Sequence, residues 1–288
     1  MRSFLLFILI FLNFELASAQ TDDGRLITIP VVFHVIYTDT LPDNGMSEEV
    51  KLSQNGNSTS RLPREKILAE LRDLDQDFQQ ANLDIADVIP EFQPVIGNPR
   101  IHFVLRGIKY VPTTLSQIKQ RNNAGKLHEL SPIQLAESCL NVYVGTLRVN
   151  GGGSEGVTNV PYNNQLPLSD AVNLNYSWVG LGYRLLTHEV GHWLGLWHVD
   201  DKSQTEISRV TDIPVQNALT DIDCEICNRP GVKVLRSQRK QFSSPNTNNY
   251  MDYSGCRRMF SLQQSNYMRN IIITLRRGIW NASISKDK

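Results

Sequence analysis

Apolar positions along the chain form several short continuous runs and one clearly helical pattern. The first run, Leu26 to Thr38, is β-branched and almost wholly apolar, which is typical of a strand buried on both faces. Similar runs at 100–108, 140–147 and 170–176 predict three further strands. From Pro63 to Phe78 the apolar residues instead recur every three or four positions, which predicts an amphipathic helix.

Two more helices are predicted in the second half of the chain. One covers roughly 182–194, where most residues are apolar. The other begins at Ser261, which forms a capping box with Gln264, and is expected to end at Gly278. Residues 41–62 are polar and rich in glycine, asparagine and serine, so they read as a surface loop. Strands and helices are thus mixed, and the last third holds much irregular chain.

The N-terminal segment has the pattern of a secretory signal peptide. Arg2 precedes an apolar run from Phe4 to Phe14, and the small residues "ASA" follow at the positions that a signal peptidase needs. We expect residues 1–19 to be removed after Ala19, leaving 20–288 as a secreted protein. The alternative is a membrane anchor, but the apolar run is shorter than the ~20 residues that span a bilayer.

Composition and charge argue against nucleic-acid and membrane partners, and the expected export bears on the state of the cysteines. The 288 residues are 41% hydrophobic and 20% charged with a net charge of zero, which favours an ordinary globular protein. We expect a monomer with no nucleic-acid or membrane partner. An even number of cysteines in an exported chain favours two disulfides of undetermined connectivity. A zinc or redox role for the C-x-x-C pair is the alternative. The four cysteines are Cys139, Cys224, Cys227 and Cys256.

The candidate chemistry lies in "THEVGHWLGLWH", which holds three of the six histidines. Residues four apart on a helix project from the same face, so His188 and His192 can bind one metal ion. Gly195 can take the backbone angles that end a helix, which lets His198 return as a third ligand. Three imidazoles with one open position are typical of a catalytic zinc site rather than a structural one.

Glu189 stands beside the first histidine and is suited to be a general base. Zinc lowers the pKa of a bound water to about 7, and a neighbouring carboxylate can take that water's proton. The pattern therefore predicts metal-assisted hydrolysis of peptide bonds without a covalent intermediate. The alternative is three histidines on an ordinary helix face. Because the surrounding residues are apolar, uncoordinated imidazoles would be buried there at a cost.

The motif from His188 to His198 resembles the metzincin signature H-E-x-x-H-x-x-G-x-x-H. Met251 in "NNYMDYSGC" matches the Met-turn methionine, which would form an apolar floor under the ligands. The resemblance narrows to the pappalysin and cytophagalysin group because three further segments also look like that group, namely "IPVVFHVIYT", "TDIPVQ" and "MF". That group implies an α+β zinc endopeptidase acting on proteins or peptides. Its upper lobe (about 26–198) would hold a twisted mixed sheet with backing helices, and its lower lobe (about 199–280) the Met-turn and C-terminal helix.

The resemblance also suggests secondary features. Tyr253 matches a tyrosine placed near the metal, where it would steady the developing oxyanion. Asp212 matches a segment where some relatives bind calcium, although one carboxylate is thin evidence for a Ca²⁺ site. Residues 153–161 are the expected sheet edge for an extended substrate, with a plain surface hairpin as the alternative.

The chain departs from the group in ways that bear on specificity. Ser254-Gly255 replaces the acidic residues that often follow the Met-turn, and Arg257-Arg258 come next. We therefore expect acidic or neutral residues, rather than basic ones, after the scissile bond. The short stretch between Gln20 and the first strand holds no cysteine, so no conventional inhibitory pro-segment is expected. The alternative function is a catalytically inactive peptide-binding relative.

Overall fold

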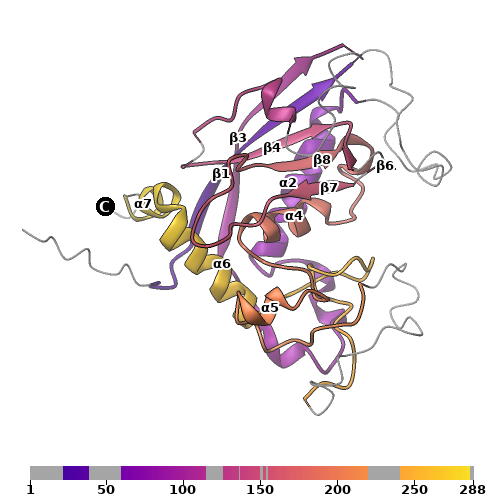
Figure 1. Ribbon diagram of the computed structural model, residues 1–288, viewed down its shortest axis with the longest axis vertical. Coiled ribbons are helices and arrows are strands. Elements are labelled where there is room, and N and C mark those ends of the chain that lie inside the picture. Colours follow the sequence, from indigo (N-terminus) through magenta and orange to yellow (C-terminus); the bar gives the residue numbers. More distant parts are fainter. Residues whose placement is uncertain are drawn as a thin grey trace, which may run out of the picture.

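The structure is a computed structural model that describes residues 22–38, 60–114, 126–135, 137–149, 152–153, 155–219 and 241–285 (Figure 1). Its centre is a five-stranded sheet of order β3-β1-β4-β8-β7. The first four strands are parallel, and β7 runs antiparallel to β8 at one edge. The fold is thus α+β with a mixed sheet, as expected. The signal-peptide residues lie outside the described part of the chain.

The four predicted strands are all present, and one of them is longer than its apolar run. They are β1 (Ile27–Tyr37), β3 (Ile101–Pro112), β4 (Leu140–Gly145) and β8 (Val172–Asn175). β3 continues to Pro112, pairing with β1 along its whole length. Because β3 is the outer strand, its last residues are half-exposed or exposed and need not be apolar. The edge expected within 153–161 is confirmed as β7 (Gly156–Thr158).

Two helices pack on the sheet and on each other. α2 (Arg64–Phe78) contacts β3, and α4 (Leu185–Trp193) contacts β7 and β8 (Figure 1). The main core joins them to one face of β1, through residues such as Ile29, Val31 and Phe33. Burial of these apolar side chains is the main force holding the sheet and the active-site helix together.

The C-terminal region differs from the expectation at one residue. The Ser261–Gln264 capping box is present, and α6 runs Leu262–Leu275. A second helix, α7 (Arg277–Ser285), then packs on β1, so Gly278 lies inside a helix rather than ending one. The expectation for Gly278 was wrong because this glycine does not end a helix. It allows a close approach of two chain segments, since an added Cβ would collide with the Glu137 carbonyl oxygen.

Short elements complete the described chain. They are β2 (Ile96–Gly97) paired with β9 (Phe260–Ser261), β5 (Arg148–Val149) paired with β6 (Gly152–Gly153), α5 (Ser203–Glu206) and four 3-10 turns. The β2–β9 pair joins the expected upper lobe to the expected lower lobe. The division into lobes at 198/199 itself stays a prediction.

His34 and His102, two of the histidines outside the motif, have structural roles in this fold. His34 lies on the second face of β1, where Ser131 Oγ is 2.7 Å from Nδ1 and Asn141 Oδ1 is 3.0 Å from Nε2. Burial lowers the pKa of His34. His102 on β3 pairs with Asp75 of α2 at 2.9 Å. Both interactions satisfy polar groups within the fold.

The cysteines correct one expectation. Cys139 is a free, buried thiol that donates a hydrogen bond to the Gln134 carbonyl at 2.9 Å. Two disulfides using all four cysteines are therefore excluded, because Cys139 enters the buried strand β4 and its thiol is satisfied locally. Cys256 is buried and disulfide-bonded. Cys224 and Cys227 lie outside the described residues.

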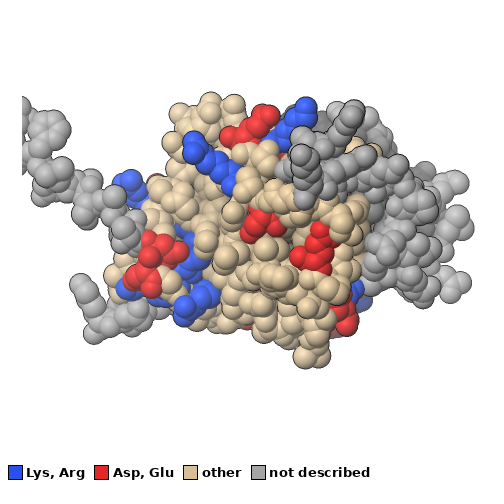
Figure 2. Space-filling view, turned by 90° about the horizontal axis from the view of Figure 1, so that it is seen from below, with Lys and Arg blue, Asp and Glu red and all other residues tan. Residues whose placement is uncertain are grey.

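The described surface carries charges of both signs. In the view from below, lysines and arginines as well as aspartates and glutamates are scattered over a largely uncharged face (Figure 2). None of the described helices combines the length and apolar character needed to cross a membrane.

Candidate active site

The start of α4 is held by acidic side chains from α2 rather than by a local cap. Arg184 occupies the N-cap position with φ of +56° and makes no capping hydrogen bond. Instead, the buried carboxylate of Glu70 accepts hydrogen bonds from the backbone N–H groups of Gly180 at 2.6 Å and Leu186 at 3.1 Å. Burial raises the pKa of Glu70. The contact with Leu186 satisfies an N-terminal donor of α4 that would otherwise be orphaned, and the contact with Gly180 fixes the segment before the helix.

A second acid of α2 ties α4 to the Met-turn. Asp77 accepts hydrogen bonds from Thr187 Oγ1 at 2.7 Å and from the Tyr250 hydroxyl at 2.7 Å, and it pairs with Arg184. Glu70 and Asp77 were not singled out from the sequence. The available signal was their position on the apolar stripe of the helix, where a charged residue is rarely buried without a partner.

The end of α4 follows the expected glycine turn. The Gly195 N–H donates to the His192 carbonyl and the Leu196 N–H to the Gly191 carbonyl, each at 2.9 Å. This is the Schellman pattern, and it requires the positive φ of +91° that Gly195 adopts. The turn reverses the chain, so that His198 comes back beside the helix.

The three motif histidines converge as expected. The Nε2 atom of His188 lies 3.2 Å from the Nε2 atoms of both His192 and His198, and the latter two are 3.0 Å apart. They form a cluster able to hold one metal ion. The Nδ1 atoms of His188 and His192 lie 2.7 Å and 2.8 Å from the carbonyl oxygens of Tyr250 and Leu196.

This donor set fits a zinc ion. A carbonyl oxygen can only accept, so Nδ1 of His188 and His192 carries the proton and Nε2 presents a bare lone pair. Burial keeps the imidazoles neutral: it lowers the pKa of His188 strongly, that of His192 to about 3, and that of His198. Imidazole nitrogens on a tetrahedral zinc, at about 2.0–2.1 Å from it, lie roughly 3.3–3.4 Å apart, close to the observed spacing.

Glu189 lies next to the cluster and against the sheet edge. Its carboxylate is buried, and its Oε2 atom has no hydrogen-bond partner among the described residues. Burial raises the pKa of Glu189 to about 7. A Cβ built on Gly156 of β7 would lie 2.5 Å from Glu189 Oε1. The edge strand therefore approaches the carboxylate so closely that any side chain at position 156 would have to displace it.

Gly156→Ala is expected to lower kcat on the order of 10²-fold while leaving the fold intact. The added methyl displaces the Glu189 carboxylate, and a shift of about 1 Å in a reacting group has an effect of this size. Steady-state kinetics and a thermal melt would test this. Gly182→Ala is the matched control, because an added Cβ there meets nothing within 4 Å, although its positive φ of +79° also predicts a small loss of stability. Wild-type kcat in the Gly156→Ala variant would contradict the expectation.

Met251 lies where the Met-turn resemblance implies. It is fully buried, and a Cβ on Gly191 would meet its sulfur at 2.5 Å. Gly191 stands between His188 and His192 in α4, so the thioether packs directly against the helix that carries both histidines. The turn is braced by Asn249, whose Oδ1 accepts from the Met251 N–H at 3.0 Å.

Tyr253 extends from the same turn over the histidines. Its ring centroid is 5.5 Å from that of His188 and 5.1 Å from that of His198. The side chain is half-exposed, and burial raises the pKa of its phenol. Tyr253 is therefore protonated at neutral pH and available at the open side of the site as a hydrogen-bond donor.

The carboxylate of Asp212 is hydrogen-bonded within the fold, and the calcium expectation gains no support. Its two carboxylate oxygens accept hydrogen bonds from Ser261 Oγ at 2.7 Å and the Gln263 N–H at 2.9 Å. The carboxylate thus supports the N-terminus of α6, where a negative charge is favoured by the helix dipole. The structure offers no support for a Ca²⁺ site at Asp212.

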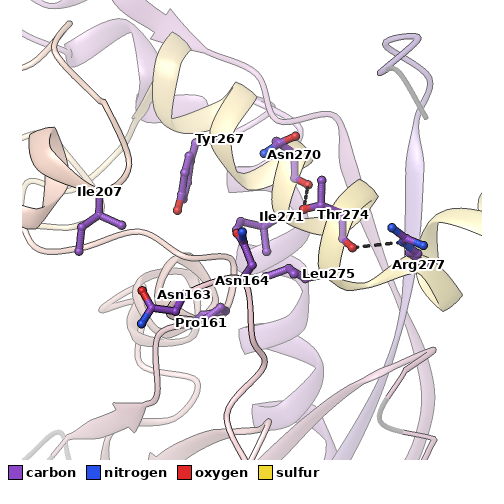
Figure 3. A pocket seen from close by; sticks show the side chains of 10 residues that line it. All are labelled: Pro161, Asn163, Asn164, Ile207, Tyr267, Asn270, Ile271, Thr274, Leu275 and Arg277. Atoms are coloured by element: carbon purple, nitrogen blue, oxygen red, sulfur yellow. Dashed lines mark hydrogen bonds between the residues drawn. The ribbon is translucent and has the colours of Figure 1, made fainter. Parts of the chain in front are cut away.

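A separate cavity of about 650 Å³ opens between the 161–164 loop and α6 (Figure 3). Tyr267, Ile271 and Leu275 line it from the helix, and Asn163 and Asn164 from the loop. Its lining includes none of the motif histidines, Glu189 or Tyr253. The cavity is therefore distinct from the metal-binding cluster.

Comparison with known proteins supports the same assignment. The peptidase M43 family profile, described as pregnancy-associated plasma protein-A, matches residues 136–273. No protein of curated function gives a significant match. Among solved structures, mirolysin in complex with compound 9 superposes with a TM-score of 0.66 and 26% identity, covering 89% of this chain and 96% of that chain.

Two further similar structures come from Tannerella forsythia. A promirolysin mutant has a TM-score of 0.69 at 23% identity and covers 91% of this chain and 86% of its own. Mature mirolysin in complex with a cleaved peptide has a TM-score of 0.63 at 23% identity and covers 91% of this chain and 98% of its own. Both show that the fold is shared over nearly the whole length.

The sheet, the histidine cluster on α4 and the methionine beneath it define a zinc metalloendopeptidase of the metzincin type. Within that class, the chain is similar to the pappalysin family, peptidase family M43, whose profile matches residues 136–273.

Proposed function

We propose that this protein is a secreted zinc endopeptidase that cleaves peptide bonds in proteins with a water activated by Glu189. One observation carries the proposal: three imidazole nitrogens, 3.0–3.2 Å apart, stand next to a buried carboxylate. His188, His192 and His198 would hold the metal. Bound zinc supplies Lewis acidity, which lowers the pKa of a water and polarises a carbonyl.

The side chains around the cluster have separate roles in the proposed reaction. Glu189 takes a proton from the water that attacks the peptide carbonyl and passes it to the departing amine. Its unpartnered Oε2 is available for that exchange. The Tyr253 hydroxyl donates a hydrogen bond to the oxyanion that develops as the carbonyl is attacked. Met251 keeps α4 and its histidines in place from below.

The substrate backbone is proposed to lie along β7. Gly156 brings this edge strand against Glu189, so a peptide extended beside it would present a carbonyl at the reacting groups. Main-chain hydrogen bonds to a sheet edge bind extended peptides with little dependence on sequence. Mature mirolysin, of similar fold, was solved in complex with a cleaved peptide.

A catalytically inactive peptide-binding protein is the competing function. It would be favoured by loss of the base or of a metal ligand. Here Glu189 and the three histidines are all present and assembled, which favours the enzyme. Export is supported only by the N-terminal pattern of Arg2, an apolar run and "ASA".

Metal removal is expected to abolish hydrolysis reversibly. The purified protein is incubated with casein, then with 1,10-phenanthroline, then with added Zn²⁺, while peptide release is measured. The chelator should stop the reaction, because the imidazoles alone offer no electrophile, and stoichiometric zinc should restore it. Activity that persists in metal-free protein, verified by elemental analysis, would refute the proposal. A phenanthroline isomer that does not chelate serves as the control.

A further inference from the structure

His188 takes its orienting hydrogen bond from a segment that is far away in the sequence. Its Nδ1 atom lies 2.7 Å from the carbonyl oxygen of Tyr250, which is 62 residues further along the chain. The corresponding partner of His192 is the Leu196 carbonyl, in the turn that ends α4. Local geometry therefore orients the ring of His192, whereas the ring of His188 depends on how the Met-turn is held against α4.

The side chain of Asp77 holds the Met-turn at this point. The Tyr250 hydroxyl donates to Asp77 Oδ1 at 2.7 Å, and the Tyr250 ring packs on Phe260 with ring centroids 4.7 Å apart. Asp77 is 3% exposed and Tyr250 is fully buried. Because water has little access to either group, losing this hydrogen bond would leave a buried donor without its acceptor.

The same carboxylate also holds the helix on which His188 stands. Its second oxygen, Oδ2, accepts a hydrogen bond from Thr187 Oγ1 at 2.7 Å, and Thr187 directly precedes His188. Arg184, at the start of α4, pairs with Asp77 and donates to the Tyr250 hydroxyl at 2.8 Å. One side chain of α2 therefore fixes both the backbone next to His188 and the residue whose carbonyl orients its ring.

Glu70, two helical turns before Asp77 on α2, has a narrower role. Its carboxylate accepts from the N–H groups of Gly180 and Leu186, so it holds the N-terminal part of α4. Its hydrogen bonds within the described part of the chain do not reach the Met-turn. Asp77 differs from Glu70 because it contacts both segments that determine where His188 points.

The orientation of a ligating imidazole affects how tightly a metal is held. A hydrogen bond from Nδ1 fixes the tautomer of the ring and the direction of the lone pair on Nε2. Loss of such outer partners typically costs about 10–100-fold in metal affinity. The Nε2 atoms of the three motif histidines are 3.0–3.2 Å apart, so a rotation of the His188 ring would move its nitrogen out of the cluster.

We propose that Asp77 is a positioning residue for the metal site: through Thr187 and Tyr250, it holds His188 in line with the other two histidines. Its own hydrogen bonds go to Thr187, Tyr250 and Arg184, so its effect on the metal is indirect. The inference rests on the ligand set of the proposed function, and it names a residue outside the motif on which metal affinity depends.

The test measures zinc affinity by competition with a chromophoric chelator. We expect Asp77→Asn and Tyr250→Phe each to weaken zinc binding by about tenfold or more. Asparagine replaces one acceptor oxygen by an amide donor, and phenylalanine removes the hydroxyl while keeping the backbone carbonyl that His188 contacts. Because both changes break the same hydrogen bond, the double variant should bind zinc little more weakly than Asp77→Asn alone.

Asp75→Asn is the matched control on the same helix. The Asp75 carboxylate accepts from the Phe103 N–H at 2.8 Å and lies 2.9 Å from His102 Nδ1, so it holds α2 to β3 rather than to α4. This variant should lose stability but keep the zinc affinity of the wild type. Melting temperatures of the metal-free proteins show whether each variant has folded. If Asp77→Asn does not fold, Tyr250→Phe carries the test.

Cobalt(II) gives a second measurement, which a general loss of stability does not change. The visible absorption of the cobalt-loaded protein depends on the geometry of the ligands, and it should change in Asp77→Asn and Tyr250→Phe but not in Asp75→Asn. Wild-type zinc affinity in both test variants, or an equal loss in Asp75→Asn, overturns the inference. Neither measurement needs turnover. A wild type that binds zinc but cleaves no peptide would refute the proposed function, while the affinities would still decide the role of Asp77.

Discussion

Replacing Glu189 by glutamine is expected to lower kcat by about 10²–10⁴-fold, the usual contribution of a positioned general base. The amide has the same shape as the carboxylate but cannot take a proton from water. Zinc content should stay at that of the wild type, because the three imidazoles are untouched. The measurements are steady-state cleavage of a quenched fluorescent peptide and elemental analysis of the purified variant.

Two controls make this result specific. Glu206→Gln changes an exposed glutamate at the end of α5 and should keep wild-type kcat. His192→Ala should lose both activity and zinc, which separates a missing ligand from a missing base. If Glu189→Gln hydrolysed peptides at the wild-type rate, another group would have to be the base.

Breaking the buried ion pair between Arg276 and Asp170 is expected to cost about 3–5 kcal/mol of unfolding free energy. Both nitrogens of the guanidinium fork bind the carboxylate, at 2.5 Å and 2.8 Å, and Nη2 also donates to the Trp193 carbonyl at 2.7 Å. The guanidinium lies 3.5 Å from the centre of the Trp193 ring. Asp170→Asn would leave this cation unpaired, and Tm should fall on the order of 10 °C.

The double variant Asp170→Asn, Arg276→Met should recover part of that loss, because it removes both charges rather than stranding one. The pair of the exposed Arg72 and the half-buried Asp73, 3.9 Å apart, is the matched control. Arg72→Met should change stability by less than about 1 kcal/mol. Chemical denaturation followed by fluorescence measures all the variants. A loss below about 1 kcal/mol in Asp170→Asn would show that the buried pair is not needed to hold α4.

The candidate site was predictable because its three histidines lie within eleven consecutive residues. His188 and His192 are one helical turn apart, and Gly195 supplies the reversal that returns His198, so backbone geometry alone brings the three together. Glu70 and Asp77 were not predictable in the same way. They lie far from α4 in sequence, and only the packing of α2 on α4 gives their buried carboxylates partners.

Distance in sequence also explains why the expectations for the cysteines and for Asp212 did not match the structure. A count of cysteines does not tell which thiols meet, and Cys139 turned out to be free at the start of a central strand. A single carboxylate does not show whether it faces a cation or a helix end, and Asp212 supports α6. Arg257 and Arg258 are adjacent and identical in type, yet among the described residues only Arg258 lies within ion-pair distance of acids.

The sequence by itself determined four strands of the main sheet, three helices, the cluster of three histidines and the carboxylate beside it, because hydrophobic period and helical spacing act within about ten residues. Only the tertiary structure decided which strand borders Glu189, which acids hold α4 and what lies beneath the histidines. Those outcomes depend on contacts between distant segments, which are selected by burial and charge balance in the folded chain rather than by any local pattern.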